Sequence, residues 1–470
     1  MLYFGKYFIR GGNLMNKKHI VLSSAMAGLL VFSATPTTFA HDMFDDAFVE
    51  KGQEGSQALN EIPVLEGTKN VGNWNEVGSA QLKKYDGVQN NTADVYAYDG
   101  YAYVGTHTKN GGEGGVRIFD LKDPSNPVEI AKFADDIPGT WQEKVIVKKV
   151  NTKEFKGDLA VVSVQQLNRS NPDSKGGFLL YDVSNPESPE KLGFWEMDKR
   201  VPGTHELYLT VKEGKPFVLA ANPYADLLTH GEEKDFALVD VSDPSAPKTI
   251  YEFDPRILPE VDEDFDGYNW NSPDGKTRPV FNHSTMTDNN GDTALLSFWD
   301  LGTIILDISD PYNVKFEGRT DYAPDVQGSA HSAALAKGGN VLIETREVYN
   351  PTKEGYEESY GYTRIFDIKD KQNPKLLSTF KTELVDDVED GITFANTVHD
   401  PKVQGNTLYL SHYAGGIRAV DITDPSNPVQ VGVYNPAGGY FWGTFVDRNY
   451  VLGSDMNQGL KVLQKNNSDK

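Results

Sequence analysis

The chain has 470 residues, a formal net charge of −23 at pH 7 and no cysteine. The negative charge repels phosphate backbones and anionic lipids, so neither nucleic-acid binding nor stable membrane insertion is expected. The lack of cysteine excludes disulfides and thiolate metal ligands. With 44 glycines, 25 prolines and no long helical periodicity, the composition favours an all-β chain rich in turns.

Residues 1–40 have the pattern of an export signal. A pair of lysines precedes an apolar stretch at 20–34, and a small-residue cleavage site ends at Ala40. The apolar stretch is short and interrupted by serines, which argues against a membrane span. Met15 is the predicted translation start, because the residues before it fit no part of such a signal. We therefore expect a secreted extracellular or cell-surface protein of a Gram-positive bacterium, with an N-terminal extension at 41–69.

A short phrase recurs six times along the chain. Each copy is an apolar strand ending in Asp, then a turn with Asp or Asn and Pro, and then a second strand, as in RIFDLKDPSNP at 117–127. Strand, tight turn and strand form a β-hairpin. The strand-ending residues are Asp120, Asp182, Asp240, Asp307, Asp367 and Asp421. A carboxylate at this place can accept backbone N–H groups across the turn, so we interpret these residues as structural.

The copies lie 54 to 67 residues apart, which is more chain than one hairpin requires. A second pair of apolar runs lies between copies, for example at 205–211 and 215–221. Each unit therefore has four antiparallel strands. Repeated four-stranded units predict the blades of a β-propeller.

The two ends of the repeat region complement each other. The last unit stops after its third strand at 459–465, and a lone strand at 75–82 precedes the first complete unit. Pairing these two strands removes the open sheet edges and closes a ring. The prediction is an all-β, seven-bladed propeller over residues 70–465, followed by a tail at 466–470; six or eight blades are the alternatives.

The repeat phrase at 117–127 and 418–428 resembles the LVIVD-repeat family of secreted and surface bacterial β-propellers. This resemblance spans roughly residues 70–465 and implies the propeller fold. A fainter resemblance, in the strands that begin with His and in YDVSNP at 181–186, is to the selenium-binding/methanethiol oxidase propellers. It implies a copper site held by histidines.

Four histidines share one register position, at the start of a blade's predicted first strand. They are His205, His283, His331 and His399. First strands line the central channel, so these side chains are expected to converge near one channel mouth. Neutral imidazoles bind transition metals, and we predict a site for Zn, Cu, Mn or Fe. Two alternatives are hydrogen bonding of the same histidines between blades and direct binding of an organic ligand.

The remaining histidines and the longest connections, at 165–177, 222–235 and 346–363, fall on the same predicted face. Loops that carry function are often longer than the scaffold requires, so this looped face is expected to bind a protein, a glycan or a small molecule. The candidate contacts are His107, His230, His412, Glu344, Arg346, Trp442 and Gln142. Of these, Gln142 and Trp442 occupy the register position of the four histidines in other blades.

An acidic segment contains Asp262, Asp264 and Asp266, followed by Gly267, and imitates the start of a calcium loop. The twelfth position holds Pro273 instead of the Glu that an EF-hand requires. The segment is either a calcium loop of another type or a solvated acidic loop.

No phosphate-cradling glycine loop or familiar catalytic motif is present in the sequence, so no nucleotide cofactor is expected. The first functional hypothesis is a secreted binding or surface-interaction protein. The alternative is a metal-dependent extracellular enzyme, an oxidoreductase or a hydrolase, that uses the histidine site.

Overall fold

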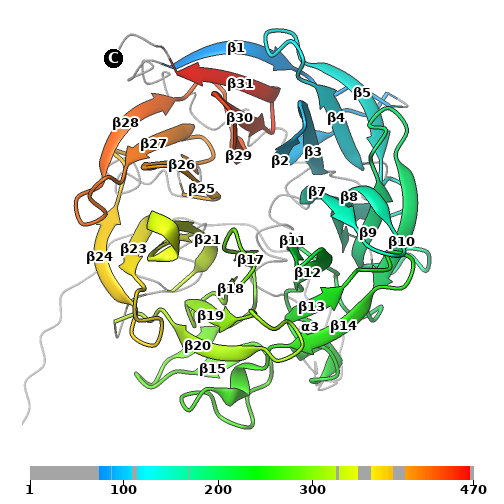
Figure 1. Ribbon diagram of the computed structural model, residues 1–470. Coiled ribbons are helices and arrows are strands. Elements are labelled where there is room, and N and C mark those ends of the chain that lie inside the picture. Colours follow the sequence, from blue (N-terminus) through cyan, green and yellow to red (C-terminus); the bar gives the residue numbers. More distant parts are fainter. Residues whose placement is uncertain are drawn as a thin grey trace, which may run out of the picture.

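The structure is a computed structural model, and it describes residues 74–465 except 86, 108–113, 168, 324, 325, 327, 348–360 and 385–396. Within these residues, seven antiparallel sheets form a ring around a central channel (Figure 1). The predicted fold class and blade number are confirmed. The proposed export signal, the N-terminal extension and the C-terminal tail lie outside the described residues.

Six blades take their four strands consecutively, from the channel outward to the rim. Blade 1 consists of β2 (Asn91–Tyr98), β3 (Tyr101–His107), β4 (Val116–Asp120) and β5 (Val128–Phe133). Blade 2 consists of β7 (Val145–Asn151), β8 (Lys156–Gln166), β9 (Gly177–Asp182) and β10 (Glu190–Glu196). Blade 3 consists of β11 (Glu206–Lys212), β12 (Lys215–Ala221), β13 (Phe236–Asp240) and β14 (Lys248–Glu252).

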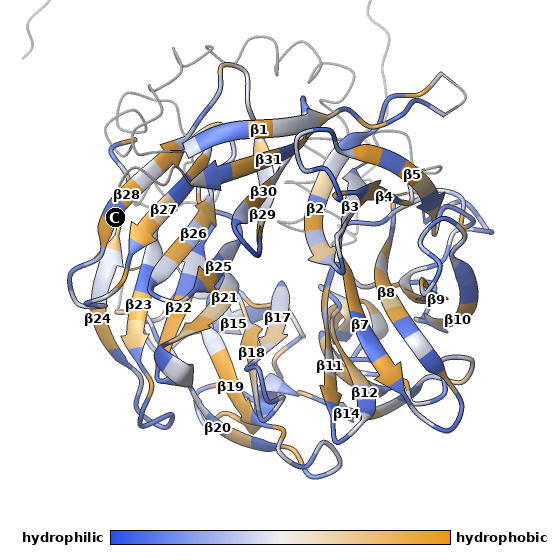
Figure 2. Ribbon diagram, turned by 45° about the horizontal axis from the view of Figure 1, so that its top comes forward, coloured by the Kyte–Doolittle hydropathy of each residue, from blue (hydrophilic) through white to orange (hydrophobic). Residues whose placement is uncertain are grey.

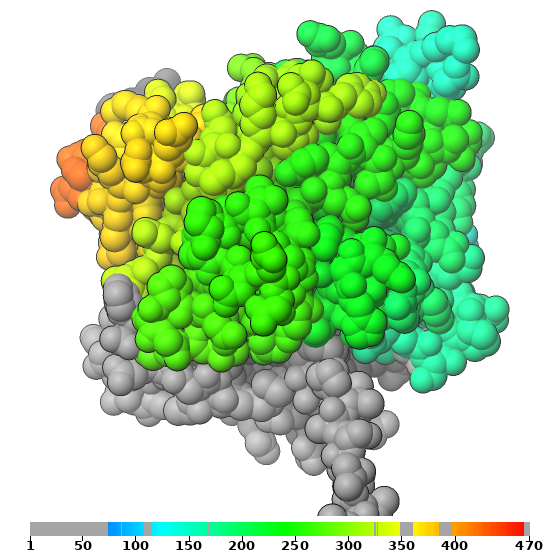
Figure 3. Space-filling model, turned by 90° about the horizontal axis from the view of Figure 1, so that it is seen from below, coloured from blue at the N-terminus to red at the C-terminus, as the bar shows by residue number. Residues whose placement is uncertain are grey.

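Blade 4 consists of β17 (Ser284–Thr287), β18 (Thr293–Ser297), β19 (Thr303–Asp307) and β20 (Lys315–Arg319). Blade 5 consists of β21 (Ala330–Ala336), β22 (Val341–Arg346), β23 (Thr363–Asp367) and β24 (Lys375–Phe380). Blade 6 consists of β25 (Pro401–Gln404), β26 (Thr407–Ser411), β27 (Ile417–Asp421) and β28 (Val429–Tyr434). Seen edge-on, successive blades follow one another in chain order from cyan through green to yellow (Figure 3).

The seventh blade joins the two ends of the described chain. It consists of β29 (Phe441–Asp447), β30 (Tyr450–Asp455) and β31 (Gly459–Lys465), with β1 (Trp74–Ala80) as the outer strand. β1 runs antiparallel to β31, from Trp74 opposite Lys465 to Ala80 opposite Leu460. The predicted closure of the ring is therefore confirmed.

A few elements lie outside the blades. Next to blade 2, β6 (Thr140–Trp141) pairs with β8. The connection between blades 3 and 4 carries the 3-10 turn η1 (Pro255–Ile257) and a separate hairpin of β15 (Asn269–Asn271) and β16 (Thr277–Pro279). Within the described residues, helix is limited to the five-residue α3 (Ala225–Thr229) and the two 3-10 turns, η1 and η2 (Lys337–Gly339).

The aspartates of the repeat stabilise the turn between third and fourth strands. Each carboxylate accepts the backbone N–H of the residue two positions later, at 2.7 to 2.9 Å. In the same turn the following Asp or Asn accepts a second N–H, as Asp243 does from Ser245 at 3.0 Å. The structural interpretation of the repeat aspartates is therefore confirmed.

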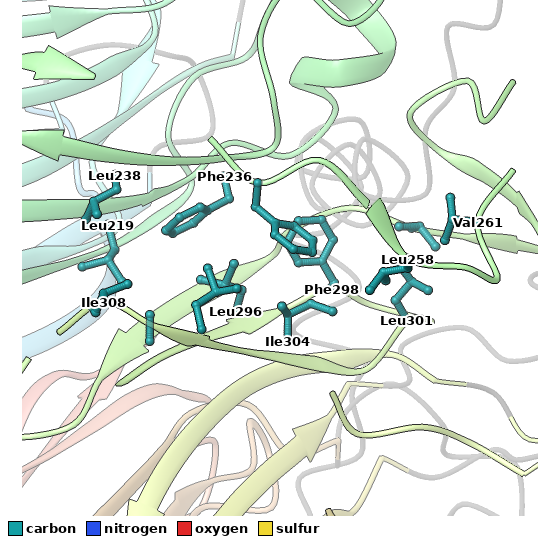
Figure 4. Close-up of a cluster of buried hydrophobic side chains, with 14 of the residues drawn as sticks. Leu219, Phe236, Leu238, Leu258, Val261, Leu296, Phe298, Leu301, Ile304 and Ile308 are labelled. Atoms are coloured by element: carbon teal, nitrogen blue, oxygen red, sulfur yellow. The ribbon is translucent and has the colours of Figure 1, made fainter. Parts of the chain in front are cut away.

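Apolar side chains between neighbouring blades form the core. The strands carry hydrophobic stretches along the ring (Figure 2). Between blades 3 and 4, Leu219 and Phe236 pack with Leu296 and Ile304, and all four are 0% exposed (Figure 4). Burial of one such side chain contributes about 1.5 to 3 kcal/mol. Packing between blades, repeated around the ring, is therefore the main source of stability.

Glycines in outer strands let each blade approach the repeat turn of the next. A Cβ at Gly193 in β10 would lie 2.0 Å from the carbonyl oxygen of Pro244, in the turn of blade 3. A Cβ at Gly318 in β20 would likewise lie 2.0 Å from the carbonyl oxygen of Lys371, in the turn of blade 5. Because backbone atoms occupy this space, no side chain fits without moving one blade away from its neighbour.

We predict that a chain ending at Gln458 is far less stable than one ending at Lys465. The first truncation removes β31, so β1 and β30 both become open sheet edges. The second removes only residues after the ring. Thermal melting of both truncations beside the full chain measures the difference. Equal melting temperatures would show that the β1–β31 pairing does not support the ring.

We also predict that Gly193→Ala lowers the free energy of unfolding by about 1 to 3 kcal/mol, the usual range for overpacking. Where space allows, the same change stabilises a protein by about 0.4 to 1 kcal/mol, so the sign of the effect tests the contact. Glu190→Ala, at an exposed position of the same strand, is the control and should change stability by less than about 0.5 kcal/mol. Urea unfolding measures both; stabilisation by Gly193→Ala would contradict the close approach.

Candidate metal centre

The four aligned histidines form one cluster inside the channel. They lie at or just before β11, β17, β21 and β25, and none is more than 2% exposed. Their rings follow one another in a row, with centroid distances of 4.5 Å (His205 to His283), 4.0 Å (His283 to His331) and 4.3 Å (His331 to His399). The common register thus brings them together as expected, although in the interior instead of at an open channel mouth.

The first pair has the spacing of two ligands on one ion. The Nε2 atoms of His205 and His283 are 3.1 Å apart. Two nitrogens bound at about 2.0 to 2.1 Å to one zinc ion, at right to tetrahedral angles, lie roughly 3 to 3.4 Å apart. Either a shared ion or a single proton between the two rings accounts for this distance.

A glutamate that the sequence did not single out joins the cluster. Ligand atoms of His283, His331 and Glu347 all lie within 4.8 Å of one another, and Glu347 is 6% exposed. The Oε2 atom of Glu347 is 3.5 Å from Nε2 of His331, while its Oε1 accepts the Tyr413 hydroxyl at 2.6 Å. Glu347 directly follows β22, the second strand of its blade. The register of the first strands, which identified the histidines, could therefore not identify Glu347.

A second glutamate orients His205. Oε2 of Glu143 is 2.8 Å from Nδ1 of His205, and its Oε1 accepts the indole N–H of Trp442 at 2.8 Å. Nδ1 of His205 also forms a hydrogen bond with Oε1 of Gln165 at 2.9 Å, so a proton on Nδ1 faces two acceptors and leaves the Nε2 lone pair toward His283, as in many metal-binding histidines. Gln142, predicted for this place, is one residue away; it accepts the N–H of Gly115 and donates to Thr140.

Burial keeps His331 and His399 neutral. Desolvation lowers the pKa of His331 well below 6.5, with repulsion from a protonated His399 or His205 as a smaller cause. The pKa of His399 is also lowered well below 6.5, mainly by burial and then by the Lys144 charge. Two nitrogens, Nε2 of His331 and Nδ1 of His399, have no hydrogen-bond partner among the described residues. Neutral imidazoles with available lone pairs are metal ligands.

Aromatic side chains surround the cluster on the side where the first strands begin. Trp442 and Tyr413 lie 5.0 and 5.1 Å from the His399 ring, and Trp299 lies 5.6 Å from the His283 ring. The other large members of this aromatic collar are Trp141, Tyr224, Phe281 and Tyr440. The collar removes water from that side of the histidines.

A layer of charged residues borders the cluster on the other side, one residue further along each first strand. Lys144 is its centre, with Nζ 2.6 Å from Asp94, 3.4 Å from Glu206 and 3.7 Å from Asp400. Burial alone would lower the pKa of Lys144, but the three carboxylates outweigh it and raise this pKa well above 10.5. We call these four residues the ion-pair layer.

The predicted looped-face contacts lie in different places. His107 and His412 are buried, and the His107 ring is 4.6 Å from Trp141 of the aromatic collar. His230 is exposed at the end of α3. Glu344 and Arg346 are 0% exposed, so they do not offer the surface contacts that we expected.

Glu344 instead joins blade 5 to blade 4, because it accepts the hydroxyl of Thr303 in β19 at 2.9 Å. Arg364 donates to Glu344 at 2.9 and 2.6 Å, and Tyr322 donates to it at 2.7 Å. Arg346 donates to the carbonyl of Gly328 at 2.7 Å. From the sequence, the position of Glu344 and Arg346 at a strand end beside His331 predicted that they lie near the cluster. It did not predict that they are buried.

Among the described residues, the side-chain oxygens of Asp262, Asp264 and Asp266 do not all lie within 4.8 Å of one another. Asp266 accepts the N–H groups of Tyr268 and Asn269 at 2.8 and 2.6 Å and so stabilises a turn. The calcium loop stays a prediction.

Comparison with known sequences identifies the repeat. The profile of the LVIVD repeat matches residues 90–135, 231–254 and 397–436. The first and third matches each cover one whole blade, from its first strand to its fourth. This chain is a β-propeller that carries LVIVD repeats. The comparison of the LVIVD-repeat chain with curated proteins finds no match.

Solved structures also resemble the LVIVD-repeat ring. They include the computationally designed protein Ika8, with a TM-score of 0.46 and 9% identity over 83% of this chain and 99% of that one. They also include Raptor of Chaetomium thermophilum, with a TM-score of 0.51 and 11% identity over 88% of this chain and 30% of that one. The likeness to Raptor shows the fold alone.

No helix in the described part of the LVIVD-repeat chain has the length and apolarity needed to cross a membrane.

We predict that the metal-free protein loses stability as the pH falls below about 6.5. The folded pKa values of His331 and His399 lie below the unfolded value, so only the unfolded chain takes up these protons. The loss is absent well above pH 6.5 and grows by about 1.4 kcal/mol per pH unit and histidine, until the folded pKa is reached.

Urea unfolding between pH 7.5 and 5.5, in chelator, measures this slope. The double variant His331→Gln/His399→Gln should flatten it, whereas His230→Gln, at the exposed histidine, should leave it unchanged. A slope that is the same in the parent and the double variant would show that the buried histidines do not cause the pH dependence.

Proposed function

We propose that this protein is an exported propeller that binds one transition-metal ion inside its channel. The observation that carries the proposal is the convergence of four buried histidines from four blades, joined by Glu347, with the Nε2 atoms of His205 and His283 at 3.1 Å. Inter-blade hydrogen bonding alone does not account for buried ring nitrogens that have no hydrogen-bond partner among the described residues, such as Nε2 of His331 and Nδ1 of His399.

The donor set points to the class of ion. His283, His331 and Glu347 offer two nitrogens and one oxygen within 4.8 Å of one another, and His205 faces His283 as a further ligand. Nitrogen and carboxylate donors without sulfur suit Zn, Cu, Mn or Fe. Each ligand comes from a rigid strand or its end, so the site is largely formed before the ion binds.

Burial favours a resident ion that stabilises the ring over catalysis. A catalytic ion keeps one open position for water or substrate, whereas the ligands here are 6% exposed or less. One ion bound to His283, His331 and Glu347 would cross-link blades 4 and 5 at the channel axis. We therefore prefer a metal-stabilised binding protein to the metal-dependent enzyme.

The long connections support the binding part of this proposal. Their described parts lie where first strands begin, on the same side as the aromatic collar, and include α3 and exposed polar residues such as His230. Export rests on the leader pattern at 1–40 and on the lack of cysteine. On this view the ring is a scaffold outside the cell, and the looped face contacts a protein or a glycan.

We predict about one transition-metal ion per chain in protein purified without a histidine tag, measured by elemental analysis. Bound metal should raise the stability by about 2.7 kcal/mol at a free concentration one hundred times the dissociation constant, and chelator should remove this gain. His283→Ala and His331→Ala should lose the ion, and Glu347→Gln should weaken its binding.

His230→Ala is the matched control, because it removes an exposed histidine far from the cluster and should leave metal content and melting unchanged. A parent protein that carries no transition metal, takes up none on titration with Zn²⁺ or Cu²⁺ and melts identically with chelator would contradict the proposal. The histidines would then be hydrogen-bonding residues between blades.

A further inference from the structure

A cavity of about 610 Å³ fills the other half of the channel, beyond the ion-pair layer. All seven blades contribute to its wall, through the first strands β2, β7, β11, β17, β21, β25 and β29. Its rim includes the exposed residues Asn289, Asn290 and Gly405, so it opens to solvent where the first strands end. The volume is in the range of small-molecule sites.

The inner end of this cavity has one more negative than positive charge. Three buried carboxylates, on Asp94, Glu206 and Asp400, face two ammonium groups, on Lys144 and Lys402. Lys144 already pairs with all three carboxylates, so it offers little to an anion. The excess negative charge in a desolvated place favours a cation.

Unused acceptors occur at the same end. Thr285 lines the cavity and is 5% exposed, and its Oγ1 has no hydrogen-bond partner among the described residues. Oδ1 of Asp94, at 3% exposure, also lacks a partner there, while its Oδ2 holds Lys144. A buried polar atom without a partner costs about 1 to 3 kcal/mol, which a donor on a ligand would relieve.

The side walls suit an apolar or aromatic body. Partly exposed Tyr96, Tyr208, Met286 and Phe445 line the cavity, and the Tyr96 and Phe445 rings are 4.7 Å apart. Aromatic faces also attract cations within about 6 Å. An inorganic ion would leave most of this volume and apolar wall without contacts.

We propose that this channel cavity binds a small organic monocation, with its ammonium group at the ion-pair layer and its apolar body between the aromatic side walls. The net charge of −23 on the whole chain raises the local concentration of such cations. The proposal is independent of the metal centre, because none of the proposed metal ligands lines the cavity.

Three probes of equal length test the proposal by calorimetry on chelator-treated protein at pH 7.5: hexylammonium, hexanol and hexanoate. Hexylammonium should bind at least tenfold more tightly than hexanol, and hexanoate should not bind. Equal binding of hexylammonium and hexanol, preference for hexanoate, no binding of hexylammonium, or its displacement by Ca²⁺ at equal concentration would overturn the proposal.

Two variants locate the binding. Glu206→Gln removes one charge of the ion-pair layer and should weaken hexylammonium binding at least tenfold. Ala333→Phe fills the cavity from a partly exposed position of β21, without changing any charge, and should abolish it. Asp262→Asn removes the same charge from the exposed acidic loop and should have no effect.

Melting curves establish that each variant is folded before it is measured. If Glu206→Gln does not fold, Ala333→Phe and Thr285→Val decide the question, since both leave the ion pairs in place. Unchanged hexylammonium binding in a folded Ala333→Phe variant would place the ligand elsewhere and refute the channel site.

Discussion

Backbone hydrogen bonds between β1 and β31 join the two ends of the described chain, and the geometry of the channel depends on them. Antiparallel pairing satisfies the N–H and C=O groups that an open blade would expose at two edges. Once the ring is closed, the seven first strands must lie side by side around one axis. Residues at equal depth on these strands then meet across the channel, although they are far apart in sequence.

The channel contains successive layers that follow from this register. Moving inward from the looped face, the aromatic collar comes first, then the histidine cluster, then the ion-pair layer one residue further along, and finally the open cavity. The aromatic collar and the blade cores exclude water, which lowers the pKa of His331 and His399. Charge is concentrated instead at Lys144 and its carboxylates. Neutral ligands and fixed charges thus occupy neighbouring layers of the same strands.

The blades are held together by three kinds of contact that differ in range. Apolar clusters such as that of Leu219 and Leu296 supply most of the stability. The close approach at Gly193 fixes how near adjacent blades lie. Buried ion pairs between blades, such as that of Lys144, beside blade 2, with Asp94 of blade 1, fix their relative orientation, because a displaced blade would leave a charge unpaired. A metal ion on His283, His331 and Glu347 would add a further link at the axis.

The sequence by itself determined the repeat, the blade number, the ring closure and the common register of the four histidines. These features depend on local alternation, turn residues and spacing, which the chain displays directly. Only the tertiary structure decided that the histidines are buried, that Glu347 and Glu143 join them, and that Glu344 and Arg346 face the interior. These outcomes depend on which side chains of different blades share one depth and one direction. A one-residue shift, such as that between Gln142 and Glu143, changes both, and sequence spacing does not resolve a shift of that size.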